Sequence, residues 1–225
     1  MSSPFDPSLL NICEQERLDR IGAIQPYGVL LGGDAGDPRI QIASADAASW
    51  LGVPGHRVLN RSFSDLLPLA LSDFPDEPGQ KRVLPGLLET ARGWLDAILC
   101  NAGAEWLVEL EPQGTDDPAQ PLANPLVGRL VEVPQSEPDL ARYAGILADV
   151  IRHTTGFYRT LVYRFLPDDC GDVIAESFEA GPPRYLGMRF PASDIPKIAR
   201  DLYRINSHRQ IPDIHAEPVS ILSSV

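Results

Sequence analysis

The three cysteines are the side chains of this sequence best suited to covalent chemistry. They lie at Cys13, Cys100 and Cys170, an odd number at wide spacing without a CxxC pair. This pattern argues against a disulfide framework and against a structural zinc site. Cys13 lies in a polar N-terminal stretch, and a flexible arm there would let its thiol reach a partner. Bond formation also requires loss of the thiol proton, which the nearby glutamates oppose and Arg17 favours. The alternative is an exposed thiol without a function.

A second candidate is the segment 191–196, which reads Pro-Ala-Ser-Asp-Ile-Pro. Asp194 precedes a predicted helix, so the simplest interpretation of its carboxylate is a helix N-cap, worth ~1 kcal/mol. Pro196 restricts Ile195 to an extended or turn conformation, which would also direct the carbonyl group of Asp194. The segment could therefore begin a helix and present a hydrogen-bond acceptor to a ligand at the same time.

Aromatic, cationic and imidazole side chains elsewhere have plain structural interpretations. Tyr163, Phe190 and Tyr203 lie on predicted strands or helices, where most aromatic side chains belong to a core. Arg209 would be a solvated surface charge. The four histidines do not have the spacing of a structural or catalytic metal site, and we expect them at the surface.

Composition limits the class of protein. The chain has 225 residues, which allows one or two domains, with 44% hydrophobic and 22% charged residues, as in soluble globular proteins. A net charge of −12 repels nucleic-acid phosphates and anionic membranes. No apolar run approaches the ~20 residues that span a bilayer, and the N-terminus does not have the pattern of a signal peptide. We therefore expect a cytoplasmic protein that binds neither nucleic acid nor membrane.

The elements that must position these candidates differ between the two halves of the chain. In the first half, the sequence predicts an N-terminal arm followed by strands at 27–31 and 39–43 and short helices at 46–51 and 63–67. An irregular Pro-rich region and a hairpin of strands 94–100 and 106–111 come next. This order is typical of a PAS-type α+β domain. Residues 111–138 contain six prolines and read as a linker, although the spacing of apolar residues in 122–131 also allows a helix.

The second half begins with a well-marked helix. The helix is predicted to begin at Ser136, where the sequence resembles a capping box with Pro138 in the first turn. It is predicted to end at Gly156. The predicted buried stripe of this helix is Leu140, Ala144, Leu147 and Ile151. Strands at 157–166 and 172–179 and a helix at about 195–205 follow, in the order of the opening half of a GAF domain. We expect residues 20–120 to form a separate domain, with no sheet shared between the halves.

The chain resembles the photosensory region of bacteriophytochromes, the bilin-binding red/far-red photoreceptors. The resemblance rests on Arg189 and Phe190 followed by the segment 191–196, and on Cys13 upstream of 22–28, Gly-Ala-Ile-Gln-Pro-Tyr-Gly. It implies an α+β fold with antiparallel sheets and flanking helices: an arm at 1–19 carrying the chromophore cysteine, a PAS domain at 20–120, and a linker, helix and truncated GAF domain at 121–225.

The resemblance also implies roles for individual residues. Cys13 would form a thioether with biliverdin. The Asp194 carbonyl would face the pyrrole N–H groups while Ile195 and Pro196 pack on the ring system. Further contacts with the chromophore would come from Tyr163, Phe190 and Tyr203 around the isomerising D ring, and from Arg209 to a propionate. In the family the residue matching Ile24 also passes through a lasso of the GAF domain.

Three functions remain open. The first is a photoreceptor fragment that belongs to a signalling protein with downstream sensory or output domains and that could form a homodimer. The second is a chromophore-free PAS/GAF module for interaction or small-ligand sensing. The third, a thiol enzyme, ranks far below because no nucleophile–base pair with an orienting group is recognisable, and we expect no enzyme. Because the second half of the GAF domain lies beyond Val225, we expect weak biliverdin binding and poor photoconversion by the 225 residues alone.

Overall fold

The computed structural model describes residues 22–113, 136–181, 183–195, 197–205 and 211–224. Predictions for the arm, the linker, Cys13, Pro196 and Arg209 therefore lie outside the described residues. The described chain forms two compact units, one made of 22–113 with 211–224 and the other of 136–204. Both units combine antiparallel sheets with a few helices, which confirms the predicted α+β class.

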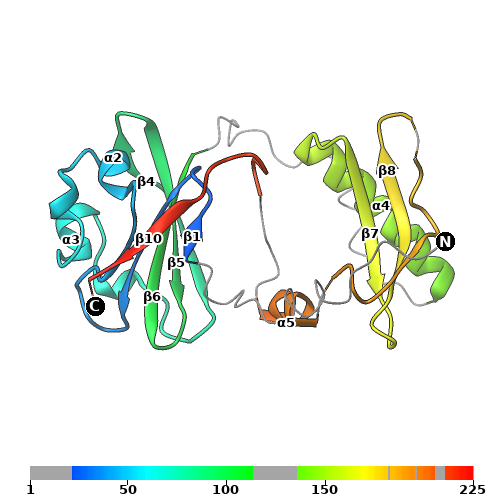
Figure 1. Cartoon of the computed structure of the whole chain (residues 1–225), viewed down its shortest axis with the longest axis horizontal. Helices are drawn as coiled ribbons and strands as arrows, with labels where there is room; N and C mark the ends of the chain where they lie inside the picture. Colours follow the sequence, from blue (N-terminus) through cyan, green and yellow to red (C-terminus); the bar gives the residue numbers. More distant parts are fainter. Residues whose placement is uncertain (1–21, 114–135, 182, 196, 206–210, 225) are drawn as a thin grey trace, which may run out of the picture. The chain divides into compact units, whose positions relative to one another are not determined.

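The first unit is built on a seven-stranded antiparallel sheet in the order β1-β10-β3-β2-β6-β5-β4 (Figure 1). Its strands are β1 (Ala23–Ile24), β2 (Val29–Asp34), β3 (Ile42–Ser44), β4 (Lys81–Thr90), β5 (Gly93–Asn101), β6 (Glu105–Pro112) and β10 (Val219–Ser223). The order shows that strands far apart in sequence become neighbours at one side of the sheet.

Short helices cover one face of this sheet (Figure 1). They are α2 (Ala47–Leu51), η1 (Gly55–Arg57), α3 (Phe63–Leu66) and η2 (Leu71–Asp73). The core between helices and sheet includes Phe63 of α3 with Leu31, Leu95, Leu99 and Leu110 of the strands, all fully buried. Burial of this apolar area is the main stabilising contribution to the unit.

The predicted hairpin is confirmed, whereas the long strand before it was missed. In β5 and β6, Ala97 pairs with Leu110 and Leu99 with Val108, and Gly103 in the connecting turn has φ 91°. The missed strand is β4, which occupies part of the region predicted to be irregular. A register shift between Leu84 and Leu88 interrupts its alternation, which is why the period-2 pattern of a strand is not visible in the sequence.

Strand β10 departs from the predicted division of the chain. It pairs with β1 through Ile24 and Val219 and with β3 through Ser44 and Ile221. The sequence interpretation assigned all of 121–225 to the second domain and expected no sheet shared between the halves, whereas β10 lies in the sheet of the first unit. A pairing between segments roughly 180 residues apart leaves no trace in local periodicity.

The second unit packs one long helix on a small sheet. Helix α4 (Glu137–Thr155) lies against β7 (Arg159–Phe165) and β8 (Gly171–Phe178), and β9 (Arg189–Phe190) pairs with the far edge of β8 (Figure 1). Its last helix is α5 (Lys197–Ile205), which begins two residues later than predicted. Within the described residues, no helix is long and apolar enough to span a membrane.

The ends of α4 agree with the sequence prediction, but its buried face differs. The Ser136 hydroxyl accepts a hydrogen bond from the Asp139 amide, and Gly156 ends the helix with φ 70°. Ala144 and Ala148 are buried against Ala175 of β8, whereas Ile151, predicted to be buried, is 37% exposed. Small alanine side chains let helix and sheet approach closely, and this contact turns Ile151 toward the surface.

Candidate functional site

Four aromatic rings of the second unit lie close together. The Tyr163 ring lies 5.2 Å from the Phe165 ring in an edge contact and 6.1 Å from the Phe190 ring. Phe190 in turn lies 6.3 Å from Tyr185. These separations are typical of interacting aromatic pairs. The structure thus brings together Tyr163 and Phe190, two of the three predicted aromatic site residues.

Tyr163 is half-buried and remains a proton donor at neutral pH. Burial raises the pKa of its phenol, and the carboxylate of Asp194 raises this pKa further, while Arg200 opposes the rise. The Asp194 carboxylate is therefore close enough to the Tyr163 phenol to influence its ionisation. A neutral hydroxyl beside a carboxylate provides both a donor and an acceptor for a polar ligand.

The backbone of 191–195 forms a turn rather than the first residues of a helix. The Asp194 amide donates to the Pro191 carbonyl over 3.1 Å, and the Asp194 side chain is exposed. Over the described part of α5, no backbone N–H donates to the Asp194 carboxylate, so the simple N-cap interpretation is not supported. Among the described residues, the Asp194 side chain is exposed and could be reached by a ligand.

Arg189 ties β9 to the β7–β8 turn. Its guanidinium forms an ion pair with Asp168 in the turn and lies 3.9 Å from the carboxylate of Asp172. Burial alone would raise the pKa of Asp168, but the Cys170 amide and Arg189 hold this pKa below its usual value. The charged pair thus fixes the residue that precedes Phe190.

A buried ion pair holds the segment before β9. The Glu176 side chain is 2% exposed, and its Oε1 lies 3.5 Å from a guanidinium nitrogen of Arg159. Its Oε2 accepts hydrogen bonds from the amides of Tyr185 and Leu186 at 3.1 and 3.2 Å. The Arg159 guanidinium also lies 4.7 Å from the centre of the Tyr185 ring. Glu176 and Arg159 were not predicted from the sequence, because nothing in a strand pattern marks a buried charge.

The remaining predicted residues are placed differently or not described. Tyr203 on α5 is 45% exposed, and within the described chain its ring contacts neither Tyr163 nor Phe190. A place for Tyr203 around the D ring of a bound chromophore stays a prediction. Ile195 is half-buried, and its carbonyl accepts a hydrogen bond from Arg200. Among the described residues, no group of three or more possible ligands could hold a metal ion.

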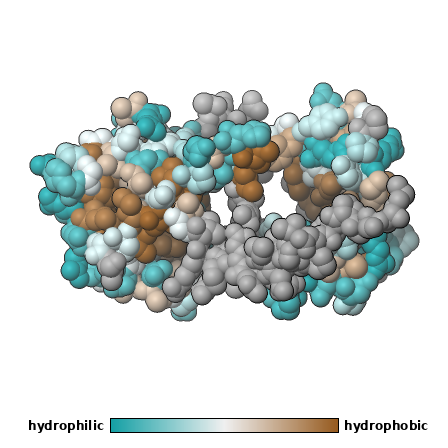
Figure 2. Space-filling view, viewed as in Figure 1, coloured by the Kyte–Doolittle hydropathy of each residue, from teal (hydrophilic) through white to brown (hydrophobic). Residues whose placement is uncertain are grey.

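A shallow cavity in the second unit lies apart from the predicted site residues. Its volume is ≈ 320 Å³ and it is lined by residues of α4, β7, β8 and the segment before β9. Arg164 in its wall pairs with Glu137 at 2.8 Å. Apolar residues also reach the surface of both units on the face shown in Figure 2. In the second unit, the Phe165 side chain is 43% exposed. The aromatic group is thus open to solvent on one side.

Comparison with known proteins identifies the family. A family model described as a PAS fold matches residues 13–113. Along its whole length the chain is 37% identical to a bacteriophytochrome of Xanthomonas campestris pv. campestris (strain 8004). Over 91% and 92% of its length it is 30% and 31% identical to phytochrome B1 of Solanum lycopersicum and phytochrome B of Oryza sativa subsp. japonica. The sequence is that of a phytochrome photosensory region.

This phytochrome region is shorter than the proteins it matches. It spans 36% of the length of the Xanthomonas bacteriophytochrome and 20% of each plant phytochrome. The PAS match begins at Cys13 and includes β1 to β6, which confirms the PAS fold predicted for the first half. The similarity to the bacteriophytochrome continues through the second unit, where the aromatic group and the segment 191–195 lie.

Proposed function

We propose that this chain is the chromophore-binding part of a red/far-red light photoreceptor, with biliverdin attached through a thioether to Cys13. The observation that carries the proposal is the pairing of the Tyr163 and Phe190 rings at 6.1 Å, with the Asp194 carboxylate acting electrostatically on the Tyr163 phenol. Similarity to phytochromes over the whole chain supports the same conclusion. We also propose that the second unit is the opening part of a GAF domain, since it has the order helix, hairpin, long excursion and helix.

The described residues fit a linear tetrapyrrole. Such a molecule is a flat conjugated system with pyrrole N–H donors and propionates, and when bound it supplies absorption of visible light. The Phe190 ring offers an apolar surface for a pyrrole ring. The exposed Asp194 offers an acceptor for N–H groups, and the protonated Tyr163 hydroxyl offers a donor. Pro196 and Arg209, which lie outside the described residues, would add a second apolar contact and a guanidinium for a propionate.

The wider context is part of the proposal. The chain would belong to a longer cytoplasmic signalling protein in which further sensory or output domains follow, with homodimerisation as a possible assembly. We propose no enzymatic activity for the 225 residues themselves. Their partner is the bilin, and a net charge of −12 makes nucleic acid and anionic membranes poor partners.

The test is to mix the purified chain with biliverdin in the dark and record its absorption spectrum. We expect a red-shifted band that survives denaturation, as a covalent adduct would, and that Cys13→Ser abolishes in the denatured protein. The matched control is Cys100→Ser, which should retain the band. If wild-type protein shows neither a shifted band nor an adduct, the photoreceptor proposal fails for this chain.

A chromophore-free PAS/GAF module is the second candidate, favoured by the open side of the aromatic group. Phe165 and Tyr203 are 43% and 45% exposed, whereas a complete small-molecule site buries most of its ligand, about 70–90% of the surface. Weak binding of biliverdin by the 225 residues, with poor photoconversion, would agree with this openness. An extended chain that covers more of the length of the relatives would then bind more tightly.

A further inference from the structure

Arg200 joins two segments of the second unit that lie far apart in sequence. Its Nη1 donates to the carbonyl oxygens of Ile195 at 2.6 Å, Ala192 at 3.3 Å and Asp169 at 3.3 Å. Its Nη2 lies 3.1 Å from Oδ1 of Asp169, and the Arg200 side chain is only 10% exposed. One buried guanidinium thus holds both the turn at 191–195 and the β7–β8 turn.

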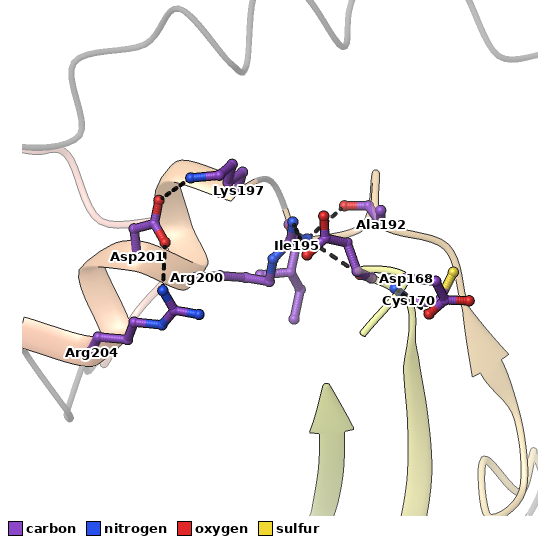
Figure 3. Close-up of polar contacts among 9 residues, drawn as sticks. Asp168, Cys170, Ala192, Ile195, Lys197, Arg200, Asp201 and Arg204 are labelled. Carbon is purple, nitrogen blue, oxygen red and sulfur yellow. Dashed lines mark hydrogen bonds and ion pairs between the residues drawn. The ribbon is translucent and has the colours of Figure 1, made fainter. Parts of the chain in front are cut away.

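The other charged residues of α5 have a different environment. Lys197 and Arg204 pair with Asp201 at 2.7 and 3.4 Å, and their side chains are 75% and 82% exposed. Figure 3 shows these three residues together along the helix, while Arg200 extends away from them toward Ile195 and Ala192. Exposed pairs of this kind contribute little to stability. Arg200, in contrast, donates hydrogen bonds to partly buried backbone carbonyls, and leaving such carbonyls without a donor would cost stability.

The two carbonyls that Arg200 binds in the turn lie on either side of Asp194. Ala192 is two residues before it and Ile195 directly follows it, and the Asp194 amide is bonded to the Pro191 carbonyl. Fixing these points removes most of the rotational freedom of the intervening peptide groups. The direction of the Asp194 carbonyl and side chain relative to Tyr163 therefore depends on Arg200.

We propose that Arg200 is the positioning residue of the chromophore site: it holds residues 192–195 against the β7–β8 turn, so that Asp194 faces the bilin. This rests on the proposed function, in which the bilin lies against that segment. Arg200 acts through the backbone of 192–195 and not by touching the ligand itself.

The geometry explains why the residue is arginine. A guanidinium carries five N–H donors in a planar fork and can serve several acceptors from one place. A lysine ammonium keeps the charge and could still pair with Asp169, but it is shorter in reach and lacks the fork. Arg200→Lys therefore tests the directed hydrogen bonds while the positive charge is kept. It also serves as the conservative variant if Arg200→Gln does not fold.

The first arm of the test needs no chromophore. Hydrogen exchange is measured for the amides of Ala192, Ser193, Asp194 and Ile195 in wild type, Arg200→Gln, Arg200→Lys and the control Arg204→Gln. We expect exchange about tenfold faster or more in Arg200→Gln, a smaller increase in Arg200→Lys, and no change in Arg204→Gln. The proposal would be overturned if the amides exchange at the wild-type rate in Arg200→Lys and also in a folded Arg200→Gln. If Arg200→Gln is unfolded by circular dichroism, Arg200→Lys alone decides it.

The second arm adds biliverdin and records the position and width of its absorption band. A merely structural role would leave the band unchanged in folded Arg200→Lys, whereas a positioning role shifts or broadens it and leaves Arg204→Gln like wild type. An identical band in wild type and Arg200→Lys would overturn the positioning role. Absence of any band in wild type would instead overturn the proposed function, and the first arm would still decide whether Arg200 orders 192–195.

Discussion

The ring of Tyr163 lies directly over the α-carbon of Gly171. A β-carbon built at position 171 would overlap Cε1, Cζ and the hydroxyl oxygen of that ring. Gly171 begins β8 and pairs with Phe165 of β7, and it is not among the glycines with positive φ. Glycine is thus required here by the space that Tyr163 fills, and the position of the tyrosine ring depends on the absence of a side chain on the neighbouring strand.

We expect Gly171→Ala to destabilise the protein by about 1–3 kcal/mol, because the ring or the backbone must move. In a protein that already carries Tyr163→Ala, Gly171→Ala should change the unfolding free energy very little. A double-mutant cycle should therefore show that the effects of the two substitutions are coupled. Gly145→Ala in α4 is the control: a β-carbon there meets nothing within 4 Å, so it should stabilise by about 0.5–1 kcal/mol. Urea unfolding of the four variants measures these changes. An equal cost of Gly171→Ala in both backgrounds would show that Tyr163 is not the cause.

The buried pair of Glu176 and Arg159 gives a second prediction. Glu176→Gln keeps an acceptor for the amides of Tyr185 and Leu186 but leaves Arg159 without its carboxylate, so we expect a loss of about 3 kcal/mol in unfolding free energy. The control is Asp201→Asn on α5, an exposed pair that should change stability by less than about 1 kcal/mol. Similar small losses in both variants would mean that the Arg159 charge is solvated.

Tyr163 should make stability depend on alkaline pH. Burial, followed by Asp194, raises the pKa of Tyr163 in the folded protein. Its contribution to stability is therefore fully present below the ordinary tyrosine pKa of about 10, and it is lost as the pH rises through the folded pKa. We expect the unfolding free energy of wild type to fall more steeply above about pH 10 than that of Tyr163→Phe. Parallel pH curves of the two proteins would contradict a raised pKa at this residue.

The features that were predicted correctly are those that nearest neighbours in sequence determine. Ser136 and Gly156 define α4 because a cap depends on a few adjacent residues. The β5–β6 hairpin was recognised because its two strands alternate regularly around the turn that contains Gly103. The roles of Tyr163 and Phe190 at a chromophore come from the family resemblance alone and stay a prediction, since neither residue type nor spacing distinguishes these rings from ordinary core residues.

The features that were missed depend on contacts that no local pattern records. Arg200 resembles any charged helix residue in the sequence, because its partners are backbone carbonyls of Ala192, Ile195 and Asp169, which every residue possesses. The placement of β10 depends on β1 and β3 offering free edges, a property of the assembled sheet.

Strand β10 should be required for order in β3 and β1. The Ala45 amide donates to the Ser220 carbonyl, and the Ile221 amide donates to the Gly22 carbonyl, both at 2.8 Å. Ile221→Pro removes the latter donor and distorts the strand, so we expect the Ala45 amide to exchange at least about tenfold faster. Ile221→Val, which keeps the amide and suits a strand, is the control. Unchanged protection of Ala45 in Ile221→Pro would show that β10 is dispensable for β3.

The site of covalent attachment can be distinguished among the three cysteines. Burial raises the pKa of Cys100, Glu109 raises it further, and Lys81 only partly opposes this, so Cys100 has little reactive thiolate. Cys170 is half-buried in the β7–β8 turn, a position that matches no attachment site. We therefore expect mass spectrometry after biliverdin labelling to find the adduct on the peptide containing Cys13. Labelling should disappear in Cys13→Ser and persist in Cys100→Ser and Cys170→Ser. An adduct on Cys170, or undiminished labelling of Cys13→Ser, would assign the bond to another thiol and remove the arm from the proposed mechanism.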